Sequence, residues 1–282
     1  MSMLPTKFWA EMSWRDFATA DMSKVVAVLP VAAIEQHGPH LPVGVDMFIN
    51  EGYLARAVAR MPPDMPVLIL PTQAIGKSNE HIEYPGTLTF SAETLAQAWT
   101  EIGNSVARAG CRKLIFMNSH GGNVPIIDLV VRELRVRCHM LAVHAAWHRL
   151  GYPPDMFSAV ERAHGIHGGD AETSLMLAFR PQTVHTSEAR NFVSSAIAIE
   201  QEFRQLRVSP PIGFGWMSSD LNELGAVGDA ANATAAKGDA CAENGAEAFL
   251  DLLRDVLAFD LARLKRGPLA RADDVSAPKR DR

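Results

Sequence analysis

Three short polar segments hold the side chains that could carry out chemistry. The densest is EQHGPHLPVGVD, residues 35–46, which brings Glu35, His37 and Asp46 within twelve residues. Side chains alternate along an extended chain, so Glu35 and His37 should project to the same side. Carboxylate and imidazole groups together suit Zn, Mn or Fe. This segment therefore predicts a divalent-metal site.

Two later segments offer further candidate ligands. NSHGGN, residues 118–123, places His120 directly after an expected strand, and in open α/β sheets ligands bind beyond the carboxyl ends of the strands. HGGDAETS, residues 167–174, opens an expected helix and carries His167, Asp170 and Glu172. We therefore expect one metal site built from Glu35, His37, Asp46, His120 and Glu172.

Taken singly, each of these residues has a plainer interpretation. Asp46 could cap a helix, Glu172 could be a first-turn carboxylate favoured by the helix dipole, and His120 could be a hydrogen-bonded polar residue. Other catalytic patterns do not fit. The glycines of SHGGN lack the GxxxxGK[ST] spacing of a phosphate loop, and no GxSxG elbow for a serine nucleophile occurs.

Strand and helix patterns alternate along the chain and would position these segments. Alternation of this kind predicts a mostly parallel sheet covered by helices on both faces. Ser91 is a suitable N-cap, and Gly110 a suitable stop, for one of the helices. The stretches 72–90 and 182–230 are expected to be irregular. We expect strands at 25–34, 67–71, 113–117 and 140–145, and helices at 46–61, 92–109, 125–137, 169–179 and 233–264.

The composition is that of an ordinary globular protein. Of 282 residues, 48% are hydrophobic and 21% are charged. The net charge of −5 does not suggest the basic surface that nucleic-acid binding needs. Three cysteines without CxxC spacing fit a reducing cytoplasm. We see no signal peptide and no apolar run of the roughly 18 residues that a membrane helix needs. We expect one domain over 1–265 and a disordered polar tail over 266–282.

The quoted motifs, with SNEHIEYPGT and GAVGDAANATAAKG, resemble the creatininase family over about residues 10–260. The chain departs from the family pattern at Ser119, Gly168 and Asp170, where Gly, Ala and Glu are usual. Creatininases proper carry an acidic ligand two residues after the histidine that corresponds to His120, and here that position is Gly122. The resemblance is therefore to the GGN branch, which includes formamide hydrolases and peptidase-like enzymes, and it disfavours creatinine as the substrate.

The resemblance implies a three-layer α/β/α sandwich with a mostly parallel central sheet, commonly assembled as a homohexamer. It also implies two divalent metal ions per chain, of Zn, Mn or Fe. Glu35 and His120 would hold one ion, His37 and Glu172 the other, and Asp46 would bridge them. By the same resemblance His167 would carry protons, and the substrate would contact Ser78, Glu80, His81 and Asp170.

The function that we expect is hydrolysis of a non-peptide C–N bond in a small cyclic amide or formamide. By resemblance, a metal-bound hydroxide would attack the carbonyl. Two alternatives stay open: a hydrolase of lactones or activated C–C bonds on the same site, and a metal-dependent binding protein without turnover. The presence of all five candidate ligands together with His167 argues against the second alternative.

Overall fold

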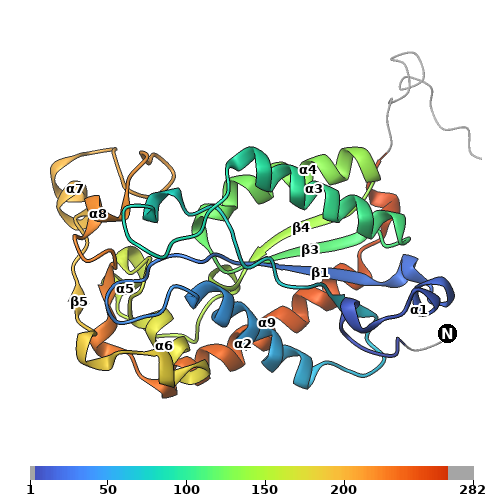
Figure 1. Cartoon of the computed structure of the whole chain (residues 1–282), viewed down its shortest axis with the longest axis horizontal. Coiled ribbons are helices and arrows are strands. Elements are labelled where there is room, and N and C mark those ends of the chain that lie inside the picture. Colours follow the sequence, from blue (N-terminus) through green and yellow to red (C-terminus); the bar gives the residue numbers. More distant parts are fainter. Residues whose placement is uncertain (1–3, 266–282) are drawn as a thin grey trace, which may run out of the picture.

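The computed structural model describes residues 4–265, and its centre is a parallel sheet in the strand order β2-β1-β3-β4 (Figure 1). Val26 of β1 pairs with both Val67 of β2 and Lys113 of β3, and Lys113 pairs with Leu141 of β4. Because β1, β3 and β4 stay in register for six residues, their carboxyl ends lie at one edge of the sheet. The strands are β1 (Val26–Val31), β2 (Val67–Ile69), β3 (Lys113–Asn118) and β4 (Leu141–Ala146).

Helices cover both faces of this sheet. In Figure 1, α3 and α4 lie on one side of the strands, and α2, α6 and α9 lie on the other. The expected three-layer α/β/α arrangement is therefore confirmed. The covering helices are α2 (Val45–Arg60), α3 (Ala92–Arg108), α4 (Val124–Cys138), α6 (Asp170–Phe179) and α9 (Ala235–Ala258).

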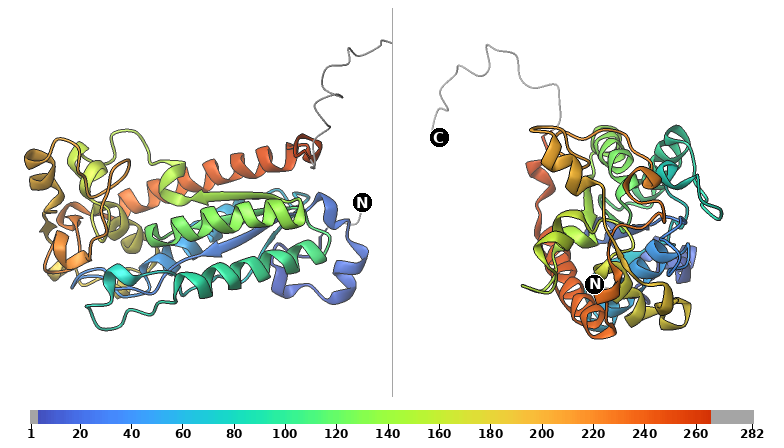
Figure 2. Two further views of the ribbon diagram at one scale, coloured as in Figure 1. Left: turned by 90° about the horizontal axis from the view of Figure 1, so that it is seen from above. Right: turned by 90° about the vertical axis from the view of Figure 1, so that its left-hand side faces the viewer.

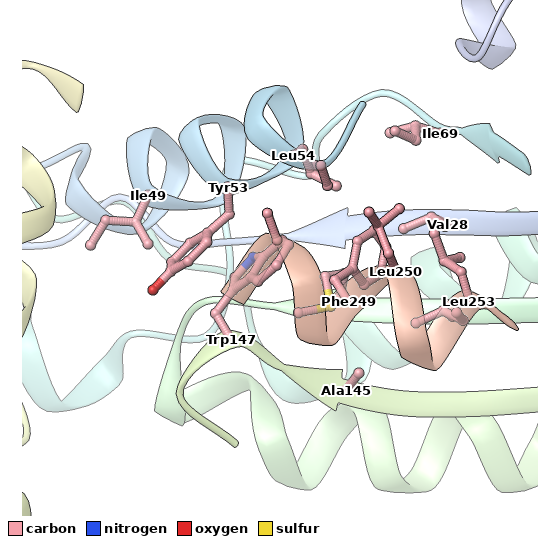
Figure 3. Close-up of a cluster of buried hydrophobic side chains, with 14 of the residues drawn as sticks. Val28, Ile49, Tyr53, Leu54, Ile69, Ala145, Trp147, Phe249, Leu250 and Leu253 are labelled. Atoms are coloured by element: carbon pink, nitrogen blue, oxygen red, sulfur yellow. The ribbon is translucent and has the colours of Figure 1, made fainter. Parts of the chain in front are cut away.

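Alternating strand residues build one core on each face, as the two-residue period of a strand requires. Val28 of β1 packs with α2 and α9, and its neighbour Leu29 packs with α3 and α4. In the first core the rings of Tyr53 and Trp147 are stacked with centroids 4.4 Å apart, beside Phe249 of α9 (Figure 3). Aromatic packing therefore contributes to the position of α2 on the sheet.

One buried polar side chain ties α2 to the ends of two strands. Asn50 donates through Nδ2 to the carbonyls of Val31, at 3.1 Å, and of Met117, at 2.9 Å. Its Oδ1 accepts a hydrogen bond of 3.1 Å from the indole of Trp147. Asn50 lies one helical turn after Asp46, so these bonds also fix where the first turn of α2 meets the carboxyl edge of the sheet.

The short elements α5, α7, α8 and β5, which follow β4, gather beyond that same edge (Figures 1 and 2). The region 182–230 was expected to be irregular, and this was wrong in part, because it contains two short helices and a two-stranded sheet. Local capping forms further short helices that we did not expect, as where Ser13 caps α1 and Ser158 caps α5. These elements are α1 (Trp14–Thr19), α5 (Ala159–His164), α7 (Ala196–Glu202), α8 (Ser218–Leu221), β5 (Asn191–Phe192) and β6 (Gly228–Asp229).

Three expected elements were also too long, one of them β2, which ends at Ile69 rather than at 71. β1 ends at Val31 rather than Ile34, because Ala32 donates to the carbonyl of Gln73 and Ile34 pairs antiparallel with Leu88. α9 ends at Ala258 rather than at 264, since Phe259 is extended. The predicted tail over 266–282 lies outside the described residues, and the single domain over 1–265 stays a prediction. Within residues 4–265, no helix has both the length and the apolar character needed to cross a membrane.

Asn50→Leu should lower the free energy of unfolding by about 1–3 kcal/mol, because it removes the bonds to the carbonyls of Val31 and Met117 and leaves the buried indole N–H of Trp147 without its partner. Urea denaturation followed by circular dichroism measures this. Gln97→Leu on the exposed side of α3 is the control and should stay near wild type. Equal midpoints for the two variants would show that Asn50 does not anchor α2.

Candidate metal centre

The carboxyl edge of the sheet gathers the predicted ligands from three parts of the chain. Glu35 and His37 follow β1 in a loop that is closed where the amide of Glu35 donates to the carbonyl of Val43. Asp46 lies in the first turn of α2, His120 follows β3, and Glu172 lies in the first turn of α6. The first four are buried, and the side chain of Glu172 is 24% exposed.

The ligand atoms form two sets that share Asp46. Nδ1 of His120 lies 3.2 Å from Oε1 of Glu35 and 3.7 Å from Oδ2 of Asp46. Nε2 of His37 lies 3.9 Å from the same Asp46 oxygen and 3.7 Å from Oε2 of Glu172. Within each set the ligand atoms lie within 4.8 Å of one another. The structure thus brings all five predicted ligands together, and their binding of metal stays a prediction.

Backbone carbonyls fix the tautomers of three histidines in this cluster. Nδ1 of His37 lies 3.0 Å from the carbonyl of Glu35, Nε2 of His120 lies 2.7 Å from that of Lys77, and Nε2 of His167 lies 2.6 Å from that of Gln36. A carbonyl only accepts, so each of these nitrogens carries a proton. In a neutral ring the other nitrogen then presents a lone pair to the carboxylates, as a metal ligand or a base requires.

The centre holds more buried polar atoms than the described residues satisfy. Both carboxylate oxygens of Glu35, Nε2 of His37 and Oδ2 of Asp46 have no hydrogen-bond partner among residues 4–265. A buried polar atom left unpaired costs about 1–3 kcal/mol, and more if it is charged. Oxygen and nitrogen donors arranged in this way fit divalent cations such as Zn, Mn or Fe.

The electrostatics of the centre lead to the same conclusion. Burial, reinforced by the neighbouring Glu35, raises the pKa of Asp46 well above its usual value. Burial lowers the pKa of His37 far below its usual value, so that its imidazole is neutral at pH 7. Burial alone would also lower the pKa of His120, but Glu35 and Asp46 raise it to about 10. Without a cation, protons therefore balance part of the negative charge.

Two asparagines of the NSHGGN segment build the loop around His120. Asn118 donates to the carbonyl of His120 at 2.6 Å and accepts from its amide at 3.1 Å. Asn123 donates to Asn118 and to the carbonyl of Ala32, and it accepts from the amide of Lys77 at 2.9 Å. The sequence reasoning gave these asparagines no role, although their positions two residues before and three residues after His120 were a signal.

Gly122 has no room for a side chain in this loop. A Cβ there would lie 2.2 Å from the carbonyl oxygen of Lys77 and 2.5 Å from Nε2 of His120. It would also lie 2.5 Å from Oε1 of Glu80. A glycine is therefore needed at this position for the Lys77 carbonyl to reach and orient His120.

Two of the four predicted substrate contacts, Glu80 and His81, border the cluster, and Ser78 precedes them in the same segment. Ser78 is buried, and its Oγ has no hydrogen-bond partner among the described residues. Oε1 of Glu80 lies 3.7 Å from Nε2 of His120, and Nε2 of His81 lies 3.3 Å from Oε1 of Glu35. Burial lowers the pKa of His81 to about 3. The substrate contacts themselves stay predictions.

The fourth predicted contact, Asp170, already has protein partners. Its Oδ2 lies 2.5 Å from Nζ of Lys237 on α9, and its Oδ1 accepts from Ser174 at 3.1 Å. The carboxylate therefore links α6 to α9. A role in substrate binding stays a prediction for Asp170, and the ion pair would have to be broken or shared for it.

His167 lies beside the metal-ligand candidates. Its ring stacks on that of His37 with centroids 4.0 Å apart, and its Nδ1 lies 3.6 Å from Oε1 of Glu35. Atoms of Glu35, His37 and His167 also lie within 4.8 Å of one another. Distance alone therefore allows His167 either to bind a cation or to exchange protons next to one.

A parallel sheet between two helical layers, with carboxylates and imidazoles buried at the carboxyl ends of its strands, is the architecture of an α/β enzyme with a metal-binding site. The family model described as "Creatininase: Creatinine amidohydrolase" matches residues 10–253. The chain belongs to the creatininase family, and it is a metal-dependent hydrolase.

Individual relatives show the same kinship. The mycofactocin precursor peptide peptidase of Mycolicibacterium smegmatis is 30% identical over 216 residues, which cover 76% of this chain and 78% of the relative. The creatinine amidohydrolase of Pseudomonas putida is 32% identical over 202 residues, which cover 64% of this chain and 75% of the relative. A solved structure described as "Creatininase Mn" has a TM-score of 0.69 and 26% identity, and covers 90% of this chain and 99% of that one.

Asp46→Asn should remove most of the bound metal while leaving the fold intact. The wild type is expected to hold about two divalent ions per chain, since five ligands are too many for one catalytic ion with an open position. The substitution is nearly isosteric but removes the charge that both ligand sets share. Elemental analysis after Zn loading measures the content. Asp128→Asn, at an exposed carboxylate beside His144, is the control and should bind as the wild type does. Full metal content in Asp46→Asn would show that Asp46 is not a ligand shared by the two sets.

Metal affinity should rise as the pH increases from 6 to 8. The pKa of His120 is raised to about 10, so its ring holds a proton that a metal must displace, and the raised pKa of Asp46 acts in the same direction. Calorimetric titration with Zn in buffers of different ionisation enthalpy should show release of about one or more protons per chain. Binding heats that do not depend on the buffer would mean that these groups are already deprotonated.

Proposed function

We propose that this hydrolase cleaves the C–N bond of a small cyclic amide or formamide with two divalent cations held by Glu35, His37, Asp46, His120 and Glu172. The observation that carries the proposal is the pair of ligand sets that share Oδ2 of Asp46. When bound, the cations would polarise a carbonyl and lower the pKa of a water molecule. Zn, Mn and Fe all suit these ligands.

The burial of the centre favours a small substrate. Glu35, His37, Asp46 and His120 are at most 5% exposed. Glu80 and Glu172 are more exposed, with side chains at 21% and 24%. We infer that a substrate enters between Glu80 and Glu172, and that it reaches the centre without water around the reacting group.

His167 is our candidate for the group that moves the proton. Its Nε2 proton is held by the carbonyl of Gln36, so Nδ1, which faces Glu35, is the atom that can take up and release a proton. An amide nitrogen leaves poorly unless it is protonated, and imidazole suits both steps near neutral pH. Stacking on His37 and His81 keeps the ring in this orientation.

Two other substrate classes have support among the relatives. The Mycolicibacterium relative is named a peptide peptidase, which favours testing short peptides. The relative from Thermotoga maritima, 25% identical over 268 residues, is named 3-dehydro-scyllo-inosose hydrolase. The second name keeps our alternative of a lactone or activated C–C bond hydrolase open. Assembly as a homohexamer and a cytoplasmic location stay predictions, which light scattering and cell fractionation would test.

A substrate panel tests the proposal directly. Protein loaded with Zn or Mn is offered cyclic amides, formamides, lactones and short peptides, and release of ammonia, formate, acid or amine is measured. We expect chelator-sensitive turnover of a cyclic amide or formamide and none by Asp46→Asn. Turnover confined to lactones or peptides would move the function to that class.

His167→Gln should lower kcat roughly a hundredfold or more, which is the usual contribution of a group that transfers a proton. Metal content and the thermal midpoint should stay near wild type. His164→Gln on α5, which faces Glu200, is the matched control and should keep full kcat. If metal content falls together with activity, His167 is a ligand, and an unchanged kcat would make its role structural.

A further inference from the structure

We propose that Gln36 locks His81 in the tautomer that places its N–H beside Glu35, which makes His81 a positioning residue for that carboxylate. The inference rests on the proposed function only in taking Glu35 as a metal ligand. It goes beyond the substrate contact that the family resemblance implies for His81, and it gives Gln36 a role that the sequence did not suggest.

His81 differs from the other three histidines of the centre. His37, His120 and His167 each place one ring nitrogen against a backbone carbonyl, which leaves a lone pair on the inner nitrogen. Nδ1 of His81 instead lies 2.8 Å from the side-chain amide nitrogen of Gln36. An amide NH₂ group only donates, so Nδ1 of His81 must accept, and the ring proton belongs on Nε2.

This assignment depends on which end of the Gln36 amide is nitrogen, and backbone groups decide it. Oε1 of Gln36 accepts from the amide of Gly38 at 2.8 Å, and Nε2 donates to the carbonyl of Gly225 at 2.8 Å. Exchanging the two atoms would set donor against donor at Gly38 and acceptor against acceptor at Gly225. The backbone therefore fixes the amide, and the amide fixes the tautomer of His81.

The ring of His81 is also held in place. His81 and Gln36 are both buried. The hydroxyl of Thr87 accepts from the backbone amide of Gln36 at 3.3 Å and donates to the backbone carbonyl of His81 at 3.1 Å. The ring stacks on His167 with centroids 4.2 Å apart. Burial, the stacking on His167 and the contact with Gln36 therefore hold the ring in one orientation.

The tautomer of His81 affects the orientation of Glu35. Nε2 of His81, which carries the proton, lies 3.3 Å from Oε1 of Glu35 without completing a hydrogen bond, so it attracts this carboxylate electrostatically and turns no lone pair toward it. Oε1 is also the oxygen that lies 3.2 Å from Nδ1 of His120, so attraction to the N–H of His81 would hold this oxygen in the orientation that faces a cation. Groups that orient a ligand in this way typically contribute 10- to 100-fold to metal affinity.

The tautomer can be measured without any metal or substrate. The full chain is labelled with ¹⁵N-histidine, and long-range ¹H–¹⁵N NMR spectra are recorded metal-free at pH 7, with His81→Gln used to assign the signal. We expect His81 to show a protonated Nε2 and an unprotonated Nδ1. A protonated Nδ1, or a mixture of both tautomers, would overturn the proposal.

Substitutions test what the donor does. Gln36→Glu places an acceptor at Nδ1, so it should move the proton to Nδ1 and weaken Zn binding about 10- to 100-fold in competition with a chelator. His81→Leu should weaken binding to a similar degree, whereas His81→Gln, which keeps an N–H donor, should stay within a few-fold of the wild type. Gln97→Glu on the exposed side of α3 is the matched control for Gln36→Glu.

The outcomes separate this proposal from the proposed function. If His81→Leu binds Zn like the wild type, His81 does not position Glu35, whatever the activity. If the wild type binds no metal, the proposed function fails, while the tautomer in the metal-free protein still decides whether Gln36 locks His81.

Discussion

The structure depends on keeping negative charge buried at the carboxyl edge of the sheet. Glu35 and Asp46 are almost fully enclosed, and Glu172 faces the same histidine as Asp46. Ions in a protein interior are tolerated only when they are paired. Histidines surround these carboxylates, and backbone carbonyls hold three of the rings in the orientation that pairing requires. A divalent cation would complete the balance that protons supply in its absence.

This constraint explains why so much irregular chain surrounds a simple sheet. The carbonyls that orient the rings come from Glu35, Gln36 and Lys77, all of them in loops that follow strands. Regular helices and strands use their own carbonyls internally, so only irregular backbone has them available for side chains. The segment before β6 contributes in the same way, because Gly225 orients Gln36, and Val227 pairs with His167 in both directions.

How much the sequence could predict follows from how local each interaction is. The strands, the long helices and the clustering of Glu35, His37 and Asp46 follow from patterns within a dozen residues. The contact between His120 and Lys77 spans 43 residues, and the one between Gln36 and Gly225 spans 189. No periodicity encodes such contacts. Glu161 shows the same limit, because its carboxylate accepts from the amides of Asp170 and Asp229 and so joins α5, α6 and β6.

The crowding at Gly122 bears on how this family can diversify. An acid at this position, as creatininases proper carry, would meet the Lys77 carbonyl, the His120 ring and Glu80 before its carboxylate reached the centre. A single substitution of Gly122 by an acid would therefore distort the loop that holds His120. A change from the loop with Gly122 to a loop with an acid at this position therefore requires that the 77–80 segment rearranges first. Laboratory evolution that mutates both segments together should find active intermediates that a scan of single substitutions would miss.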